Sequence, residues 1–180
     1  MPNYDFTVTF NLPDTEPHPS HYVDVLQMNG CDDALVGVGR FGKIALNFTR
    51  DASSAAEAVY SAIADVKRAI PEAKLIEVSP DLTSITDVAK RLGCTRQNIR
   101  TLLMTGGANS PNPVYNGTPS IWHLSDILTW LVQEKNYKVD SELLELSQVN
   151  RDLNTIREWQ RVDVERQREL ESLFTRLLPA

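Results

Sequence analysis

The sequence has little cysteine and no long apolar run. Its 180 residues include only Cys31 and Cys94, which are far apart, so we expect two free thiols. No apolar stretch approaches the roughly 18 residues of a membrane-spanning helix. The first residues, MPNYDFTVTF, lack the basic start and apolar core of a secretory signal. We therefore expect a cytoplasmic protein with no membrane partner.

Residue sets that catalyse reactions or bind metals are also scarce. His18 and His21 have no cysteine partners at metal-ligand spacing. The Gly37-Val38-Gly39 stretch lacks the third glycine, the lysine and the following helix of a phosphate-binding loop. No nucleophile–base pair and no paired carboxylates stand at useful spacing. The sequence thus predicts no enzyme, no metal site and no cofactor.

Positive charge is confined to one part of the chain. The formal net charge is −6. Residues 1–80 hold 6 basic and 11 acidic residues, and residues 139–180 hold 6 and 9, whereas residues 81–138 hold 6 and 4. An acidic remainder suppresses indiscriminate binding to nucleic acid and leaves recognition to a local basic surface.

Residues 1–80 predict a domain with the element order β-α-β-β-α-β. The order is that of a ferredoxin-like domain, with a four-stranded antiparallel sheet and both helices on one face. The overall fold class is α+β. The expected elements are a strand at 4–12, a loop marked by Pro13, Pro17 and Pro19, a helix at 21–28 with Tyr22, Val25, Leu26 and Met28 inward, a hairpin of 34–40 and 43–50, a helix from Ser53 or Ser54 to Ile70, and a strand at 74–78.

The function of this first domain does not follow from its fold. Tyr4, Phe6 and Phe10 alternate with polar residues, so we expect them in the core rather than on an RNA-binding surface. A protein partner and a small-molecule ligand both stay open. Ser79-Pro80-Asp81 marks the expected end of the domain.

Residues 84–104 predict two short helices joined by a tight turn. Ser84 with Asp87, and then Thr95, are suited to capping the two helices. Gly93 suits a turn residue with positive φ. Ala89 and Ile99 suit the crossing point of a helix-turn-helix, whose second helix, Thr95–Met104, normally enters the DNA major groove. An ordinary helical hairpin with a solvated polar face is the alternative.

The residues after the second helix favour a winged form of this motif, over residues 81–137. Residues 113–124 predict a β-hairpin about Asn116-Gly117, and Ser125 is suited to capping a further helix. Side chains that can donate hydrogen bonds to bases or phosphates belong to the second helix, to Lys90 and to the wing at Tyr115–Ser120. The predicted DNA-binding residues are Lys90, Thr95, Arg96, Gln97, Asn98, Arg100, Thr101, Tyr115, Asn116, Thr118, Ser120 and His123.

The segment DVAKRLGCTRQNIRTLL, followed by PVYNGTPSIWHLSDILTWL, resembles the small DNA-binding domains of phage excisionases, AlpA-like regulators and the MerR family. The resemblance covers residues 83–131 and implies double-stranded DNA as the partner. Many relatives carry basic residues where this chain has Trp122-His123-Leu124, which implies a weaker grip of the wing on phosphate.

Residues 138–180 predict one long helix of about forty residues, because they contain no glycine and their apolar residues recur every three or four positions. Arg166 and Gln167 interrupt the apolar stripe, which indicates a bend or two helices. The favoured interpretation is a coiled coil between two copies, as in MerR-like proteins. The alternative is a helix that covers only its own chain.

These features predict a dimeric, sequence-specific DNA-binding protein, most simply a bacterial or phage transcriptional regulator. The alternative is a protein-interaction module, such as an antitoxin-like or packaging-adaptor component, whose main partner is another protein. The acidic charge of residues 1–80 motivates that alternative.

Overall fold

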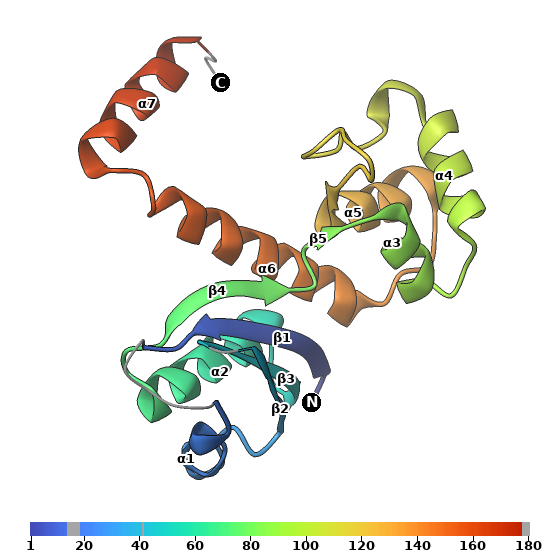
Figure 1. Ribbon diagram of the computed structural model, residues 1–180. Coiled ribbons are helices and arrows are strands. Elements are labelled where there is room, and N and C mark those ends of the chain that lie inside the picture. Colours follow the sequence, from blue (N-terminus) through green and yellow to red (C-terminus); the bar gives the residue numbers. More distant parts are fainter. Residues whose placement is uncertain (14–18, 41, 178–180) are drawn as a thin grey trace.

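The computed structural model describes residues 1–13, 19–40 and 42–177. The expected loop residues 14–18, which include His18, and Phe41 in the hairpin turn lie outside this part of the chain. The described chain is a mixed α/β structure built around one four-stranded sheet and a separate helical unit (Figure 1).

The N-terminal sheet contains the four predicted strands. They are β1 (Asn3–Asn11), β2 (Ala34–Arg40), β3 (Lys43–Asp51) and β4 (Lys74–Ser79). Their order is β2-β3-β1-β4, and every neighbouring pair is antiparallel. Along β1, buried residues alternate with residues that face outward, as the sequence predicts. Successive side chains of a strand point to opposite faces of the sheet.

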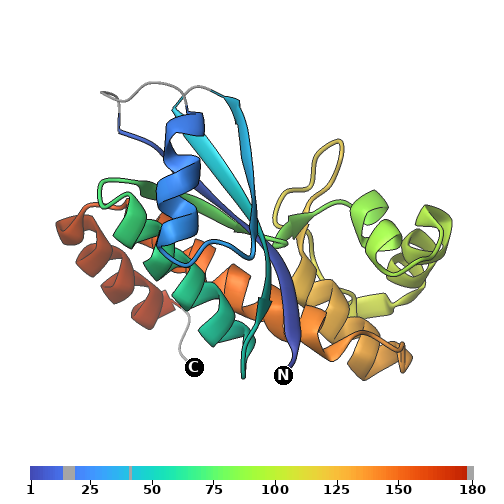
Figure 2. The same cartoon turned by 90° about the horizontal axis from the view of Figure 1, so that it is seen from below.

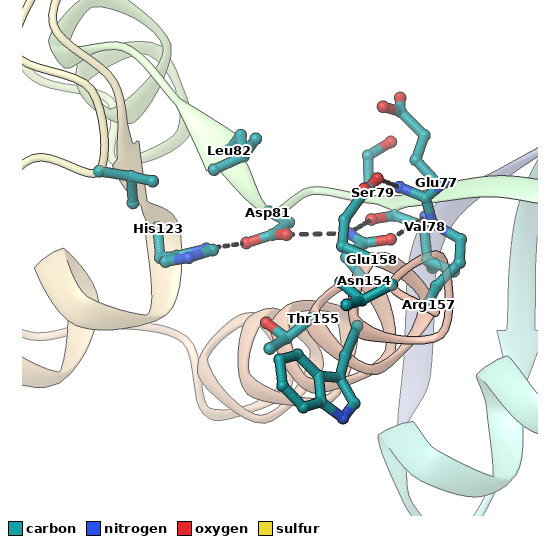
Figure 3. Close-up of a pocket in the computed structure, with 13 residues that line it drawn as sticks. Glu77, Val78, Ser79, Asp81, Leu82, His123, Asn154, Thr155, Arg157 and Glu158 are labelled. Carbon is teal, nitrogen blue, oxygen red and sulfur yellow. Dashed lines mark hydrogen bonds and ion pairs between the residues drawn. The ribbon is translucent and has the colours of Figure 1, made fainter. Parts of the chain in front are cut away.

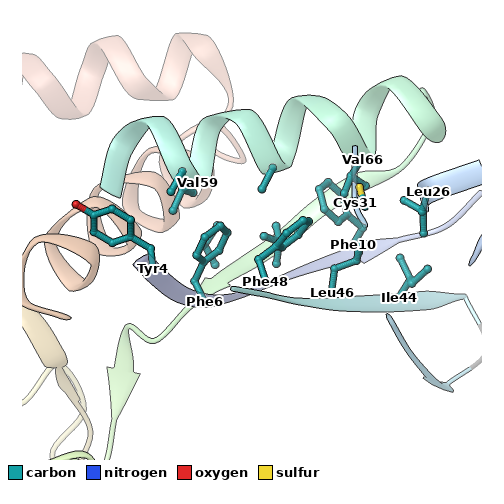
Figure 4. Packing of buried hydrophobic residues seen from close by; sticks show 14 of the residues in the cluster. Tyr4, Phe6, Phe10, Leu26, Cys31, Ile44, Leu46, Phe48, Val59 and Val66 are labelled. Carbon is teal, nitrogen blue, oxygen red and sulfur yellow. The ribbon is translucent and has the colours of Figure 1, made fainter. Parts of the chain in front are cut away.

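One face of the sheet carries the first hydrophobic core. Helix α2 (Ala55–Ala69) lies across it, and Ser54 caps this helix by accepting a hydrogen bond from the Glu57 amide. Phe6 and Phe48, from neighbouring strands, stack with their ring centroids 5.4 Å apart beneath α2 (Figure 4). The predicted placement of the strand aromatics in the core is confirmed.

The predicted helix at 21–28 is present, but only its later part is α-helical. It consists of a 3-10 turn, η1 (Pro19–Tyr22), and α1 (Val23–Met28). Leu26 is buried, but Met28 is 85% exposed, so its predicted inward position is wrong. Two residues along a helix are about 200° apart around its axis, so Leu26 and Met28 cannot face the same way.

The second unit begins directly after β4. It contains β5 (Leu82–Thr83), α3 (Ile85–Arg91), α4 (Arg96–Thr105), the 3-10 turn η2 (Gly107–Asn109), β6 (Trp122–His123) and α5 (Leu124–Lys135). Strands β5 and β6 pair antiparallel. A second hydrophobic core lies between the helices and includes Val88, Ile99, Trp122, Leu128 and Leu131.

Two predictions in this unit are wrong in detail. Asn116-Gly117 does not form a two-residue hairpin turn, because a single antiparallel bridge joins Tyr115 to Ile121 and encloses a five-residue loop. Trp122 and His123, which follow this loop, pair with β5 and do not extend the hairpin. Ser125 does not cap α5, which begins one residue earlier, so the Ser125 hydroxyl is buried inside the helix.

The C-terminal region forms two helices rather than one. Helix α6 (Ser141–Trp159) and helix α7 (Val164–Leu177) are separated at Gln160–Asp163. The break precedes the predicted one at Arg166-Gln167, because the Asp163 carboxylate accepts hydrogen bonds from the backbone amides of Glu165 and Arg166 and so starts a new helix.

Helix α6 packs on its own chain and joins the two units (Figures 1 and 2). Leu146 and Val149 belong to the first core, whereas Leu143 packs against the second. Asn150 donates a hydrogen bond to the Pro80 carbonyl, and Arg151 forms an ion pair with Asp126 on α5. Helix α6 therefore covers its own chain, and a coiled coil between two copies stays a prediction.

Candidate nucleic-acid interface

The turn between α3 and α4 has the local geometry that its residues predict. Ser84 Oγ accepts from the Asp87 amide and donates to the Asp87 carboxylate at 2.6 Å, which lowers the pKa of Asp87. Thr95 Oγ1 accepts from the Asn98 amide at 3.1 Å. Gly93 has a φ of 63°, a value that residues with a Cβ rarely adopt. The two caps and the glycine turn are confirmed.

The crossing of the two helices is tight. Ala89 and Ile99 are 3% and 1% exposed, and the Cys94 amide donates to the Ala89 carbonyl at 2.9 Å. Cys94 itself is half-buried behind the turn, where a hydrogen bond between its side chain and Tyr137 raises the pKa of Tyr137. This packing fixes the direction in which α4 leaves the turn, and so decides which of its side chains face the solvent.

The solvent-facing side of α4 is polar. Gln97 donates to the Thr101 hydroxyl at 3.3 Å, one turn further along the helix. Arg96 and Arg100 are likewise four residues apart, so their guanidinium groups lie on one side of the helix. All of the predicted α4 residues are exposed, namely Arg96, Gln97, Asn98, Arg100 and Thr101, together with the capping residue Thr95.

A groove separates the N-terminal half of α4 from the loop at 116–120. Its volume is about 490 Å³, and it is lined by Arg96 and Arg100 on one side and by Thr118 and Ser120 on the other. Ser84 and Thr86 at the start of α3 also line it, and sequence reasoning assigned them no contact with DNA. The structure therefore brings two predicted helix residues together with two predicted wing residues.

The loop that faces α4 is held in shape by its own contacts. The backbone amides of Tyr115 and Ile121 donate to each other's carbonyls at 3.2 and 2.9 Å. Ser120 Oγ donates to the Gly117 carbonyl at 3.0 Å. A Cβ on Gly117 would lie 2.1 Å from the Tyr115 ring, so only glycine allows this ring to pack over the loop. Asn116 and Thr118 are exposed at its tip.

The cations of α3 and α4 form no ion pair among the described residues. These cations are Lys90, Arg91, Arg96 and Arg100, and all four are exposed. The described ion pairs use arginines elsewhere in the chain: Arg50, Arg68, Arg151, Arg157, Arg161 and Arg166. A cation without a protein partner remains available to an anion from solution.

The structure places His123 away from this groove. Its Nδ1 lies 2.6 Å from Asp81 Oδ1, and Asp81 is only 4% exposed. The structure therefore does not bring His123 together with the predicted groove residues, because β6 pairs with β5 and the His123 ring contacts Asp81. Lys90 is exposed at the end of α3 but does not line the groove.

The described residues offer no metal site, since no three histidine, cysteine, aspartate or glutamate side chains among them are placed to hold an ion. None of the described helices combines the length and the apolar composition needed to cross a bilayer. No known protein family, curated protein or solved structure matches this chain significantly.

Proposed function

We propose that this protein binds double-stranded DNA sequence-specifically and acts as a dimeric transcriptional regulator in the cytoplasm. The observation that carries the proposal is a set of four exposed cations on residues 81–138, the net-positive segment. These cations form no ion pair among the described residues, and two of them face a polar loop across a groove. In this proposal residues 81–137 form a winged helix-turn-helix, and α4 is the recognition helix.

Each side of the groove has its own task. Helix α4 enters the major groove, where Arg96 and Arg100 donate to guanine edges or phosphates and Gln97 reads a base edge. The helix N-terminus at Thr95 points its free amides toward a phosphate. The loop of Asn116, Thr118 and Ser120 follows the backbone or the minor groove, and it adds hydrogen bonds but no charge.

The other two regions supply dimerisation and a second input. The antiparallel order β2-β3-β1-β4 supports the ferredoxin-like assignment of residues 1–80. Helix α7 has no buried residue, and Val164, Leu173, Phe174 and Leu177 are between 41% and 74% exposed. A helix of 14 residues is marginal alone in water, so we assign α7 to pairing with a second copy.

The test is a selection of binding sites from random duplexes, followed by fluorescence anisotropy with the selected duplex. The double variant Arg96→Ala plus Arg100→Ala should weaken binding about 100-fold, since each lost base or phosphate contact is worth about 1–3 kcal/mol. Its free energy of unfolding should change by less than about 0.5 kcal/mol, because both side chains are exposed.

The matched control is Lys43→Ala plus Lys74→Ala, which removes the same charge from exposed positions on the sheet. This control should bind the selected duplex nearly as well as the wild type. Equal losses in both double variants would mean that only net charge matters. A selection that enriches no sequence would contradict the proposal.

A second candidate function is binding of a protein partner by the sheet. The outward face of the sheet is polar, with Asp5 bonded to Thr49 at 2.7 Å and Asp51 bonded to Asn3 at 3.1 Å. A partner captured by the full chain, and lost when Asp5 and Asp51 are both changed to lysine, would favour this function if no DNA sequence is selected.

A further inference from the structure

A cavity of about 620 Å³ lies where the sheet, the second unit and α6 meet (Figure 3). Glu77 reaches it from β4, Leu82 from β5, and Val114 from the segment before the loop. Asn154 and Trp159 reach it from α6. A molecule in this cavity would contact both units and the helix that joins them.

The polar side chains of Asp81 and Asn154 beside the cavity already have partners, whereas Arg157 Nε is buried without one. Asp81 contacts His123 Nδ1 and accepts from Asn154 Nδ2 at 2.8 Å. The same Asn154 amide pairs with the edge of β4, accepting from the Val78 amide at 2.9 Å and donating to its carbonyl at 2.8 Å (Figure 3). Because Asp81 and Asn154 are satisfied, a ligand does not have to supply hydrogen bonds to them.

The remaining walls are apolar and exposed. Leu82, Val114 and Trp159 are 61%, 57% and 37% exposed, although they come from three separate elements. Covering such surface is favourable in proportion to the apolar area removed from water. The volume of about 620 Å³ lies within the range of small-molecule pockets, roughly 300–1,000 Å³.

The charges around the cavity disfavour an anion. Glu77 is exposed at its edge and forms no ion pair among the described residues. Glu158 is the second exposed carboxylate, and the nearby Arg157 is already paired with it. No cation of the cavity is left without a carboxylate.

We propose that this cavity binds an uncharged small molecule with an aromatic or alicyclic ring body. The ring lies against Trp159 and Leu82, and its polar substituent, if it has one, points to solvent between Glu77 and Glu158. This site goes beyond the proposed DNA interface and does not depend on it.

The test uses the full chain without DNA and two probes of equal ring size, 1-naphthalenemethanol and 1-naphthoate. The indole resonance of Trp159, assigned with Trp159→Phe, is followed by NMR during titration. The neutral probe should shift it saturably with a Kd at or below about 1 mM, as expected for a ligand of this size. The anion should bind about tenfold more weakly, because Glu77, which has no ion-pair partner among the described residues, repels it.

Leu82→Asp and, separately, Val114→Asp should each weaken binding of the neutral probe at least tenfold. Leu35→Asp is the matched control, because Leu35 is 78% exposed on β2 and does not line the cavity, and it should bind as the wild type does. The probe-free spectra report whether each variant is folded.

Several results would overturn the proposal. One is the absence of a saturable shift at Trp159, and another is a shift that persists unchanged in both aspartate variants. Equal affinity for 1-naphthoate and 1-naphthalenemethanol would contradict the assignment of an uncharged ligand. A wild-type dimer that dissociates in Leu82→Asp, measured by sedimentation, would assign the cavity to an interface between copies.

Discussion

Arginine has opposite roles in the two units of the molecule. Arg50 on β3 is 9% exposed, and all five of its N–H groups have acceptors: Asp33 takes two, and Asp65, Ser61 and the Gly30 carbonyl take one each. Its guanidinium also lies 4.8 Å from the centre of the Phe48 ring. The first unit thus uses this charge to tie β3 to α2 and to the loop before β2.

The second unit keeps its arginines out of such networks. Arg96 and Arg100 are exposed on α4 and have no ion-pair partner among the described residues. This unit is stabilised instead by helix caps and by apolar packing at Ala89 and Ile99. The difference separates charges that stabilise a fold from charges that are available to a ligand.

The largest effect on stability is expected at Arg50. Arg50→Ala should lower the free energy of unfolding by about 3–5 kcal/mol, because it leaves Asp33 partly buried without a counter-ion and Asp65 with only the exposed Arg68. Urea denaturation followed by circular dichroism measures this loss. A loss below about 1 kcal/mol would show that Arg50 is no more structural than the arginines of α4.

The contacts that sequence reasoning found are mostly short-range. Ser84, Gly93 and Thr95 act within three residues of their partners, so the local pattern was enough to predict their roles. The alternation in β1 likewise predicts its buried side, because a strand has a period of two residues.

The contacts that sequence reasoning missed join distant segments. Asp81 meets His123 and Asn154, which are 42 and 73 residues away, and no local pattern marks such a pairing. The apolar stripe of α6 fits a coiled coil and a helix on its own core equally well, since both require the same periodicity. The start of α7 is a local feature that sequence reasoning also missed, although Asp163 is a recognisable cap residue.

A smaller and pH-dependent effect is expected at Tyr4, the second buried polar group that stabilises the first unit. Its hydroxyl donates to Glu145 on α6 at 2.7 Å, and this hydrogen bond together with burial raises the pKa of Tyr4 to about 12. Stability from this bond is fully present below pH 10, the ordinary pKa, and is lost as the pH rises toward 12.

Tyr4→Phe should therefore cost about 2 kcal/mol at neutral pH and less than that above pH 11. Thermal unfolding at a series of pH values measures both. The control is Tyr60→Phe, since Tyr60 is 55% exposed on α2 and its change should leave the unfolding temperature near that of the wild type. A cost for Tyr4→Phe that does not vary with pH would rule out the bond to Glu145 as its source.

The smallest effect tests the turn of the second unit. Gly93→Ala should destabilise the protein by about 1 kcal/mol, because alanine is strained at a φ of 63° although open space surrounds the site. Gly93→Asn should cost less, since asparagine tolerates this conformation better. If both substitutions are neutral in chemical denaturation, the turn does not depend on glycine.

The central claim is that α4 lies in the major groove with its free arginines at guanine edges. Methylation interference on the selected duplex tests it most directly, because methylation of guanine N7 blocks the major groove and methylation of adenine N3 blocks the minor groove. We predict interference at guanine N7 in two clusters about one helical turn, or a multiple of it, apart, one for each copy of a dimer. The Arg100→Ala variant should lose interference at one guanine in each cluster. Interference at adenine N3 alone, or the same pattern in Arg100→Ala as in the wild type, would contradict the account.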